Sequence, residues 1–129
     1  MESTKTIVGI ANKDVWERAA TVGEYVQSTL DTTLAEVGFI HCSFPSQTLE
    51  IVNRKFLDRD DLVLLLIDED KVSAPVKHEA ALSGRAGTFP HIYGPLNVEA
   101  VYKVLPLEKD GEGKFKAPSE FQKLVTATQ

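Results

Sequence analysis

Two short segments of the sequence place histidines among apolar and aromatic residues. The first is GFIHCS, residues 38–43, and the second is FPHIYGPL, residues 89–96. Side chains alternate between the faces of a strand, so an extended first segment presents His41 and Ser43 together, about 7 Å apart. Cys42 then faces the core as a small hydrophobic residue. An imidazole and a hydroxyl on one face are typical of a cleft wall, although a half-buried histidine bonded to a neighbouring loop would give the same pattern.

The second segment combines a histidine with a tyrosine. His91 and Tyr93 share a face if the segment is extended, and an imidazole beside an aromatic ring suits the binding of a ribose or a planar ring. Pro90 and Pro95 limit backbone hydrogen bonding, which predicts a shaped loop or an edge strand rather than a central strand. The alternative is that the aromatic residues only close the core.

Glu79 is a carboxylate inside the otherwise apolar segment VKHEAAL, residues 76–82. Such a group can orient a sugar hydroxyl or stabilise an oxocarbenium-like centre by its charge. Its neighbour His78 is expected on the opposite face. The alternative is a solvated partner for Lys77 or Arg85.

Other chemistry fits these residues less well. His41, His78, His91 and Cys42 lack the spacing of metal ligands, and strand neighbours face opposite ways, so no metal site is predicted. A Cys42 nucleophile with His91 as its base is a further alternative, but the alternation buries the thiol. The sequence has no glycine-rich phosphate loop.

Apolar periodicity predicts an α+β fold, with a mostly antiparallel sheet and two helices in the N-terminal half. The run LVLLLI, residues 62–67, predicts a strand buried on both faces. The expected strands are 6–11, 37–44, 62–68 after an aspartate-rich turn, 75–82 and 98–107, with a last edge strand near Phe115. Three helices are expected. The first is capped by Asn12 and ends at Gly23, the second begins at Pro45 and includes Phe56, and the third lies within 119–129.

Length and charge limit the classes of function. The 129 residues form one domain, with a core over about 5–107 and a C-terminal tail over 108–129. The 19 acidic and 14 basic residues give a net charge of −5, so duplex nucleic acid is not an expected partner. A small anionic ligand stays open, because a few local cations or a helix N-terminus suffice for one phosphate. A lone cysteine, no secretory signal and no apolar run long enough to span a bilayer predict a cytoplasmic protein without a membrane partner.

The order of motifs resembles a known family. Trp16, GEY followed by STLD, GFIHCS, Gln47, DLVLLLID, VKHE and FPHIYGPL follow one another as in the uncharacterised family catalogued as domain of unknown function 952. The resemblance covers about residues 5–107. His78 stands where that family commonly has tryptophan, and Gly94 where it sometimes has arginine.

The family is similar in architecture to the ADP-ribosyltransferases, which hold NAD in a cleft between two antiparallel halves of a split sheet. The resemblance therefore implies an ADP-ribosyltransferase-like fold, with Glu79 and His41 as catalytic residues. Ser43, His91 and Tyr93 would bind the ligand.

Three functions stay open at this point. The chain is an enzyme acting on NAD or a related nucleotide, a non-catalytic module that binds a small ligand, or a structural or interaction protein without an active site. NAD is the cofactor that the first function implies.

Overall fold

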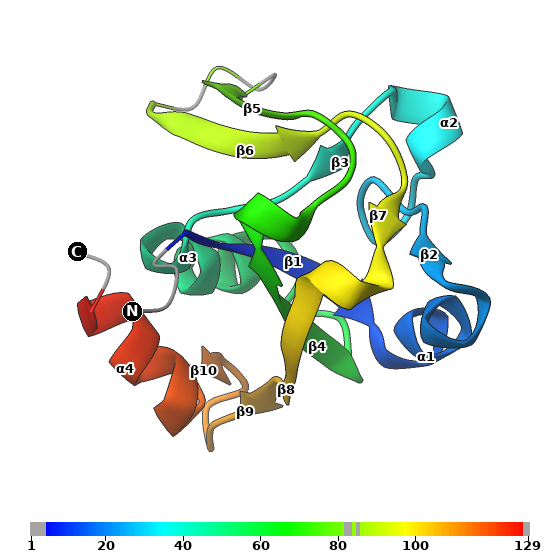
Figure 1. Ribbon diagram of the computed structural model, residues 1–129. Coiled ribbons are helices and arrows are strands. Elements are labelled where there is room, and N and C mark those ends of the chain that lie inside the picture. Colours follow the sequence, from blue (N-terminus) through cyan, green and yellow to red (C-terminus); the bar gives the residue numbers. More distant parts are fainter. Residues whose placement is uncertain (1–4, 82–83, 85, 128–129) are drawn as a thin grey trace.

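The computed structural model describes residues 5–81, 84 and 86–127 (Figure 1). The strands are β1 (Thr6–Asn12), β2 (Glu24–Tyr25), β3 (Ile40–His41), β4 (Leu62–Asp68), β5 (Val76–Ala80), β6 (Thr88–Ile92), β7 (Leu96–Asn97), β8 (Val101–Pro106), β9 (Glu108–Lys109) and β10 (Phe115–Lys116). The helices are α1 (Lys13–Val22), α2 (Leu34–Val37), α3 (Pro45–Lys55) and α4 (Ser119–Ala127), with 3-10 turns at Glu69–Lys71 and Val98–Ala100.

The main β-structure consists of two antiparallel sheets, ordered β1-β4-β8 and β3-β6-β5. They meet where Val8 and Ser43 exchange two backbone hydrogen bonds, of 2.8 and 2.9 Å. In Figure 1, β5 and β6 lie at the top, and β1 and β4 cross the centre. This arrangement confirms the predicted α+β fold with mostly antiparallel sheets.

Strand β4 is buried on both faces, as its continuous aliphatic run predicts. Leu62, Leu64 and Leu66 belong to the core cluster that includes residues of α3 and α4. Leu65 and its neighbours on the opposite face belong to the cluster packed against α1. Each fully buried aliphatic side chain contributes about 1.5–3 kcal/mol, so β4 anchors both layers of the fold.

Both predicted N-terminal helices form. The first, α1, ends at Gly23, whose φ of 108° is favourable for glycine and whose N–H donates to the Ala19 carbonyl at 2.8 Å. The predicted cap at Asn12 is wrong in one respect, because this side chain makes no capping hydrogen bond and the residue ends β1.

Helix α3 begins with Pro45, which is favourable at a first helical position. Gln47 accepts a hydrogen bond from the Phe44 N–H at 2.8 Å and donates one to the Thr88 carbonyl at 2.9 Å. This one side chain therefore both caps α3 and ties its start to β6.

The strand predicted over 37–44 is much shorter in the structure. The residues just before it form a helix that was not predicted, α2, because Thr33 and Glu36 make a reciprocal capping box at its start; of the predicted strand, this helix takes only Val37. Gly38, with a φ of 103°, ends this helix and turns the chain into β3. Similarly, the strand predicted over 98–107 begins only after a 3-10 turn.

The prediction of a loop or edge position for residues 89–96 is wrong for β6, which is the central strand of its sheet. In an antiparallel ladder, the N–H and C=O of one residue point to the same neighbour. The Pro90 carbonyl accepts from the Cys42 N–H at 3.0 Å, so the missing Pro90 N–H faces the short end of β3. The proline therefore removes one ladder bond where that pairing ends.

The predicted strand over 75–82 corresponds to β5, but its last residue, Leu82, lies outside the described residues. None of the helices in the described part of the chain is long and apolar enough to cross a membrane.

Candidate functional site

The two histidines of the motifs lie opposite each other on neighbouring strands. His41 of β3 pairs with His91 of β6, and their ring centroids are 5.5 Å apart in an edge-to-face arrangement. Glu79 lies on β5, on the other side of β6. Three strands thus bring together residues that are separated by up to fifty positions in the chain.

Glu79 links the second histidine to the tyrosine. Its Oε1 accepts hydrogen bonds from Tyr93 Oη at 2.6 Å and from His91 Nδ1 at 2.8 Å. The bond from Tyr93, and secondly the bond from His91, lower the pKa of the Glu79 carboxyl, so it is ionised at neutral pH and only accepts. His91 must therefore carry a proton on Nδ1, so that its Nε2 is the ring nitrogen left for other contacts.

A serine fixes the first histidine in the same way. Ser28 Oγ donates its one proton to the Phe39 carbonyl at 2.5 Å, so it accepts from His41 Nδ1 at 2.9 Å. The hydrogen-bond network thus assigns the Nδ1–H tautomer to neutral His41. Burial, and secondly the electrostatic effect of His91, lower the pKa of His41. A hydrogen bond with the Ser28 backbone raises it by less, and the charge of Lys55 lowers it slightly further. At neutral pH, His41 presents an unprotonated Nε2.

Phe39 holds both rings in place. It stacks on His91 with centroids 4.1 Å apart and an interplanar angle of 21°, and it contacts His41 at 4.7 Å. The opposite face of the first motif, residues 38–43, carries Ile40 and Cys42, which belong to the core. This confirms the predicted alternation of side chains along the first motif.

A pocket of about 230 Å³ lies against these rings, and we call it the histidine pocket. It is bounded by β1, β3, β6, α3 and the loop before α2. Its lining residues are Val8, Ile10, Ser28, Thr29, Leu30, His41, Cys42, Ser43, Ile51, Arg54, Lys55, Phe56, Ala81, Phe89 and His91.

The predicted site residues differ in how they relate to this pocket. His41, His91 and Ser43 line it. Glu79 and Tyr93 are not lining residues: Glu79 bonds to Nδ1 of His91, and Tyr93 bonds to Glu79. Ser43 is only 2% exposed, and its hydroxyl is bonded to Thr48 Oγ1 at 2.7 Å. Since Thr48 in turn donates to the Phe44 carbonyl, Ser43 is the donor and has no free proton for a ligand.

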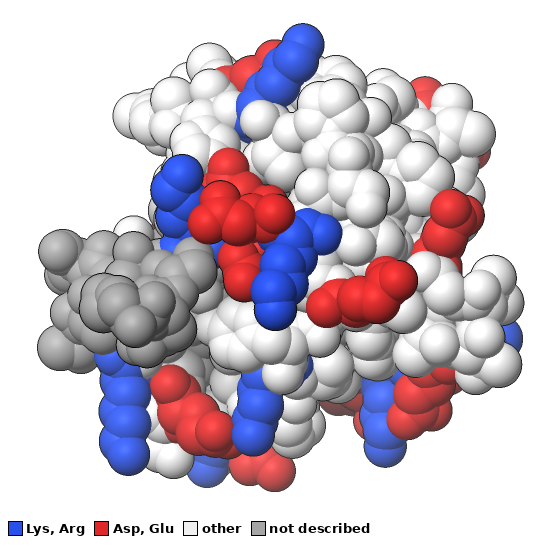
Figure 2. Space-filling model, in the orientation of Figure 1, with Lys and Arg blue, Asp and Glu red and all other residues white. Residues whose placement is uncertain are grey.

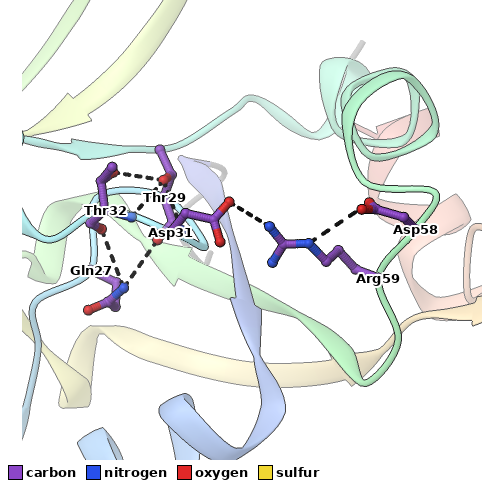
Figure 3. A network of polar contacts seen from close by, with 6 residues as sticks. All are labelled: Gln27, Thr29, Asp31, Thr32, Asp58 and Arg59. Carbon is purple, nitrogen blue, oxygen red and sulfur yellow. Dashed lines mark hydrogen bonds and ion pairs between the residues drawn. The ribbon is translucent and has the colours of Figure 1, made fainter.

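The loop that contributes Ser28, Thr29 and Leu30 to the pocket wall is held by the network in Figure 3. Thr29 and Thr32 hydroxyls are 2.7 Å apart, and Arg59 donates to Asp31 at 2.5 Å. Arg59 follows α3, so this ion pair fastens the loop to the far end of the helix that forms the opposite wall.

The remaining predicted groups lie elsewhere. His78 Nε2 is 3.0 Å from Glu69 Oε2 on the face opposite Glu79, as expected. Lys77 Nζ lies 4.9 Å from the centre of the Tyr93 ring instead of pairing with Glu79, and Arg85 lies outside the described residues. Among the described side chains, no three His, Cys, Asp or Glu residues are close enough together to hold a metal ion.

Cys42 is buried, and its burial raises the pKa of the thiol to about 12. A thiol this buried and this weakly acidic is a poor nucleophile at neutral pH. The position of Cys42 in the apolar core explains its chemistry, although this residue also borders the histidine pocket.

Sequence reasoning did not identify Ser28, Phe39, Arg54 or Lys55 as site residues. Phe39 belongs to the first motif, and its alternation with His41 indicated a shared face. Arg54 and Lys55 follow Ile51 at the end of an amphipathic helix, where basic residues are ordinary. Ser28 gave no signal, because its bond to His41 depends on a loop that folds back from thirteen residues away.

Charged side chains of both signs are interspersed on the face of the molecule shown in Figure 2. The sequence-based exclusion of duplex nucleic acid stays a prediction.

Comparisons with known proteins identify a family and a similar solved structure. The chain matches the family described as "Protein of unknown function (DUF952)" over residues 10–104. The crystal structure of protein CC0527 from Caulobacter crescentus is similar, with 30% identity and a TM-score of 0.77, over 92% of this chain and 99% of that one. The solution NMR structure of CC0527 gives 31% identity and a TM-score of 0.71, over 87% and 91%. No curated protein matches the chain.

Proposed function

The chain belongs to the DUF952 family, and from its geometry we propose that it binds a small ligand bearing hydroxyl groups in the histidine pocket, where His91 is a general base. The observation that carries this proposal is the pair of hydrogen bonds that Glu79 Oε1 accepts from His91 and Tyr93. They leave Nε2 of His91 to take a proton, and place a carboxylate where it stabilises the protonated ring.

The ligand class follows from the hydrogen-bonding character of the two rings. With the proton on Nδ1, the neutral forms of His41 and His91 each offer Nε2 as an acceptor, and this atom has no hydrogen-bond partner among the described residues in either ring. A matching ligand must donate, and the adjacent hydroxyls of a ribose do so. NAD or a related nucleotide is therefore the ligand class that we propose. A pocket of about 230 Å³ is below the usual range of about 300–1,000 Å³, so it suits one ribose with its substituent rather than a whole dinucleotide.

Each residue then has a distinct role. His91 takes the proton of a ligand hydroxyl, and the resulting imidazolium is stabilised by the Glu79 carboxylate 2.8 Å from Nδ1. Tyr93 orients Glu79, and His41 accepts from a second hydroxyl. Ser43 shapes the wall through Thr48. A general base of this kind accelerates a reaction by about 10²–10⁴-fold.

A second candidate is glycosyl transfer from NAD in an ADP-ribosyltransferase-like cleft, with Glu79 acting directly on the positive charge of the ribose. It is favoured by the Glu79 side chain, which is 37% exposed and whose Oε2 has no partner among the described residues. The junction of two antiparallel sheets beside the pocket also supports this arrangement. In this candidate, the nicotinamide end of the ligand extends past His91 towards β5.

The chain offers a matched pair of variants for the test. Glu79→Gln and Glu69→Gln each remove one negative charge and weaken one contact between a glutamate and a histidine, on opposite faces of the sheet. Binding of ribose, AMP, nicotinamide and NAD is measured by calorimetry and by the shift in unfolding temperature, which rises for a ligand that binds only the folded state. We expect Glu79→Gln to weaken binding about tenfold and Glu69→Gln to leave it unchanged.

Three results separate the functions. Release of nicotinamide from NAD by the wild type, lost in Glu79→Gln, supports the glycosyl-transfer enzyme. Binding of ribose or AMP without turnover supports a binding module. If none of the four compounds binds, or if both variants weaken binding equally, the histidine pocket is not the ligand site and the chain is best regarded as a structural or interaction protein.

A further inference from the structure

We propose that Arg54 and Lys55 form an anion subsite at the solvent side of the histidine pocket, which binds the phosphate group of a phosphorylated sugar or mononucleotide. This inference deepens the proposed function and rests on it for the sugar part of the ligand. The anion part rests on a separate set of residues and is tested separately.

The first argument is the uneven charge of the pocket. Arg54 and Lys55 both line it, whereas none of the described lining residues is acidic. The chain as a whole carries a net charge of −5, so two cations without an acid in the wall contrast with the rest of the molecule. A cleft lined by one sign of charge raises the local concentration of ligands of the opposite sign.

The second argument is the availability of these cations. Lys55 has no hydrogen-bond or ion-pair partner among the described residues, and Arg54 uses only Nε, at 3.4 Å from Glu50 Oε2. The terminal nitrogens of the guanidinium stay available. An arginine fork and a lysine ammonium together match the several oxygens of a phosphate group.

The third argument is the position of the cations relative to the histidines. Both cations are exposed, whereas His91 is 2% exposed and lies at the inner end. The charge of Lys55 contributes to the lowered pKa of His41, so the ammonium lies within electrostatic range of that ring. A ligand with hydroxyls at one end and a phosphate at the other would match this arrangement. Its hydroxyls would donate to the two histidines, and its phosphate would accept from Arg54 and Lys55 at the solvent side. Ribose 5-phosphate and 5′-mononucleotides have this chemistry.

The experiment uses a double variant and a control of equal charge. Arg54→Gln with Lys55→Gln removes both cations of the subsite. The control, Arg18→Gln with Lys123→Gln, also removes two positive charges. Arg18 pairs with Asp14 on α1, and Lys123 is an exposed residue of α4. Inorganic phosphate, ribose, ribose 5-phosphate and AMP are titrated into the wild type and both variants, followed by calorimetry and by amide chemical shifts.

We expect inorganic phosphate to cause saturable shifts at Arg54, Lys55 and His41 that disappear in the double variant and persist in the control. Ribose 5-phosphate should bind about tenfold more tightly than ribose to the wild type, and the double variant should lose this preference. AMP binding as tightly as ribose 5-phosphate would identify a nucleotide ligand, and weaker AMP binding a free sugar phosphate.

Separate results overturn the two proposals. If phosphate causes no saturable shift at Arg54 and Lys55, or if the control variant loses the effect equally, the anion subsite is wrong. If phosphate binds there but ribose and ribose 5-phosphate bind no better than phosphate, the subsite stands and the proposed recognition of hydroxyls by His41 and His91 fails.

Discussion

Substitution of Ser28 by alanine tests the network that orients His41. Ser28 is 2% exposed, and its hydroxyl joins the Phe39 carbonyl at 2.5 Å to His41 Nδ1 at 2.9 Å. In Ser28→Ala, the Phe39 carbonyl loses this donor, and the His41 Nδ1–H loses its acceptor.

The expected cost comes mainly from the carbonyl. His41 can move its proton to Nε2, which faces the pocket and water, so its own loss is partly relieved. The Phe39 carbonyl has no such alternative, and a buried polar group left without its hydrogen bond costs about 1–3 kcal/mol. We therefore expect the free energy of unfolding to fall by about 2 kcal/mol, which most domains tolerate without unfolding.

Two measurements check this prediction. Urea unfolding gives the change in stability, with Ser73→Ala as control, because Ser73 is exposed and its substitution should cost less than about 0.5 kcal/mol. Nitrogen-15 shifts of the imidazole give the tautomer, which should change from Nδ1–H towards Nε2–H. A Ser28→Ala protein with the stability of the control and an unchanged His41 tautomer would refute the assigned network.

Three further predictions concern other parts of the molecule. In Gly94→Ala, the new Cβ would lie 2.8 Å from Ala74 Cβ at a backbone φ of 158°, so we expect a loss of about 1–3 kcal/mol in urea unfolding, partly relieved by adding Ala74→Gly; a double variant no more stable than Gly94→Ala would contradict this contact. Because the pKa of His41 is lowered in the folded chain, the unfolded chain binds more protons as the pH falls below about 6.5. Stability should therefore decrease with falling pH in that range, and less so in His41→Gln; equal slopes for the two proteins would show that His41 is not responsible. Since burial raises the pKa of Cys42 to about 12, iodoacetamide at pH 8 should label the native protein at least about tenfold more slowly than the urea-unfolded protein, and equal rates would contradict its burial.

The strand patterns largely predicted the secondary structure and the faces of the two motifs. Period-2 alternation placed His41 beside Phe39 and away from Cys42, and the aliphatic run of β4 indicated burial on both faces. Short local signals were harder to interpret. The capping box of Thr33 and Glu36 starts a helix, α2, that was not predicted and that includes the first residue of a predicted strand. Pro90 is tolerated in a central strand because its missing donor lies where β3 ends.

The sequence by itself determined which residue types were available for chemistry, because the apolar surroundings of His41, His91 and Glu79 are local features of the chain. Only the tertiary structure decided their partners. Glu79 bonds to His91 because β5 and β6 pair in one register, and Ser28 reaches His41 because a distant loop folds back. Hydrogen bonds act over about 3 Å, and contacts between segments far apart in the chain leave no period or spacing in its sequence.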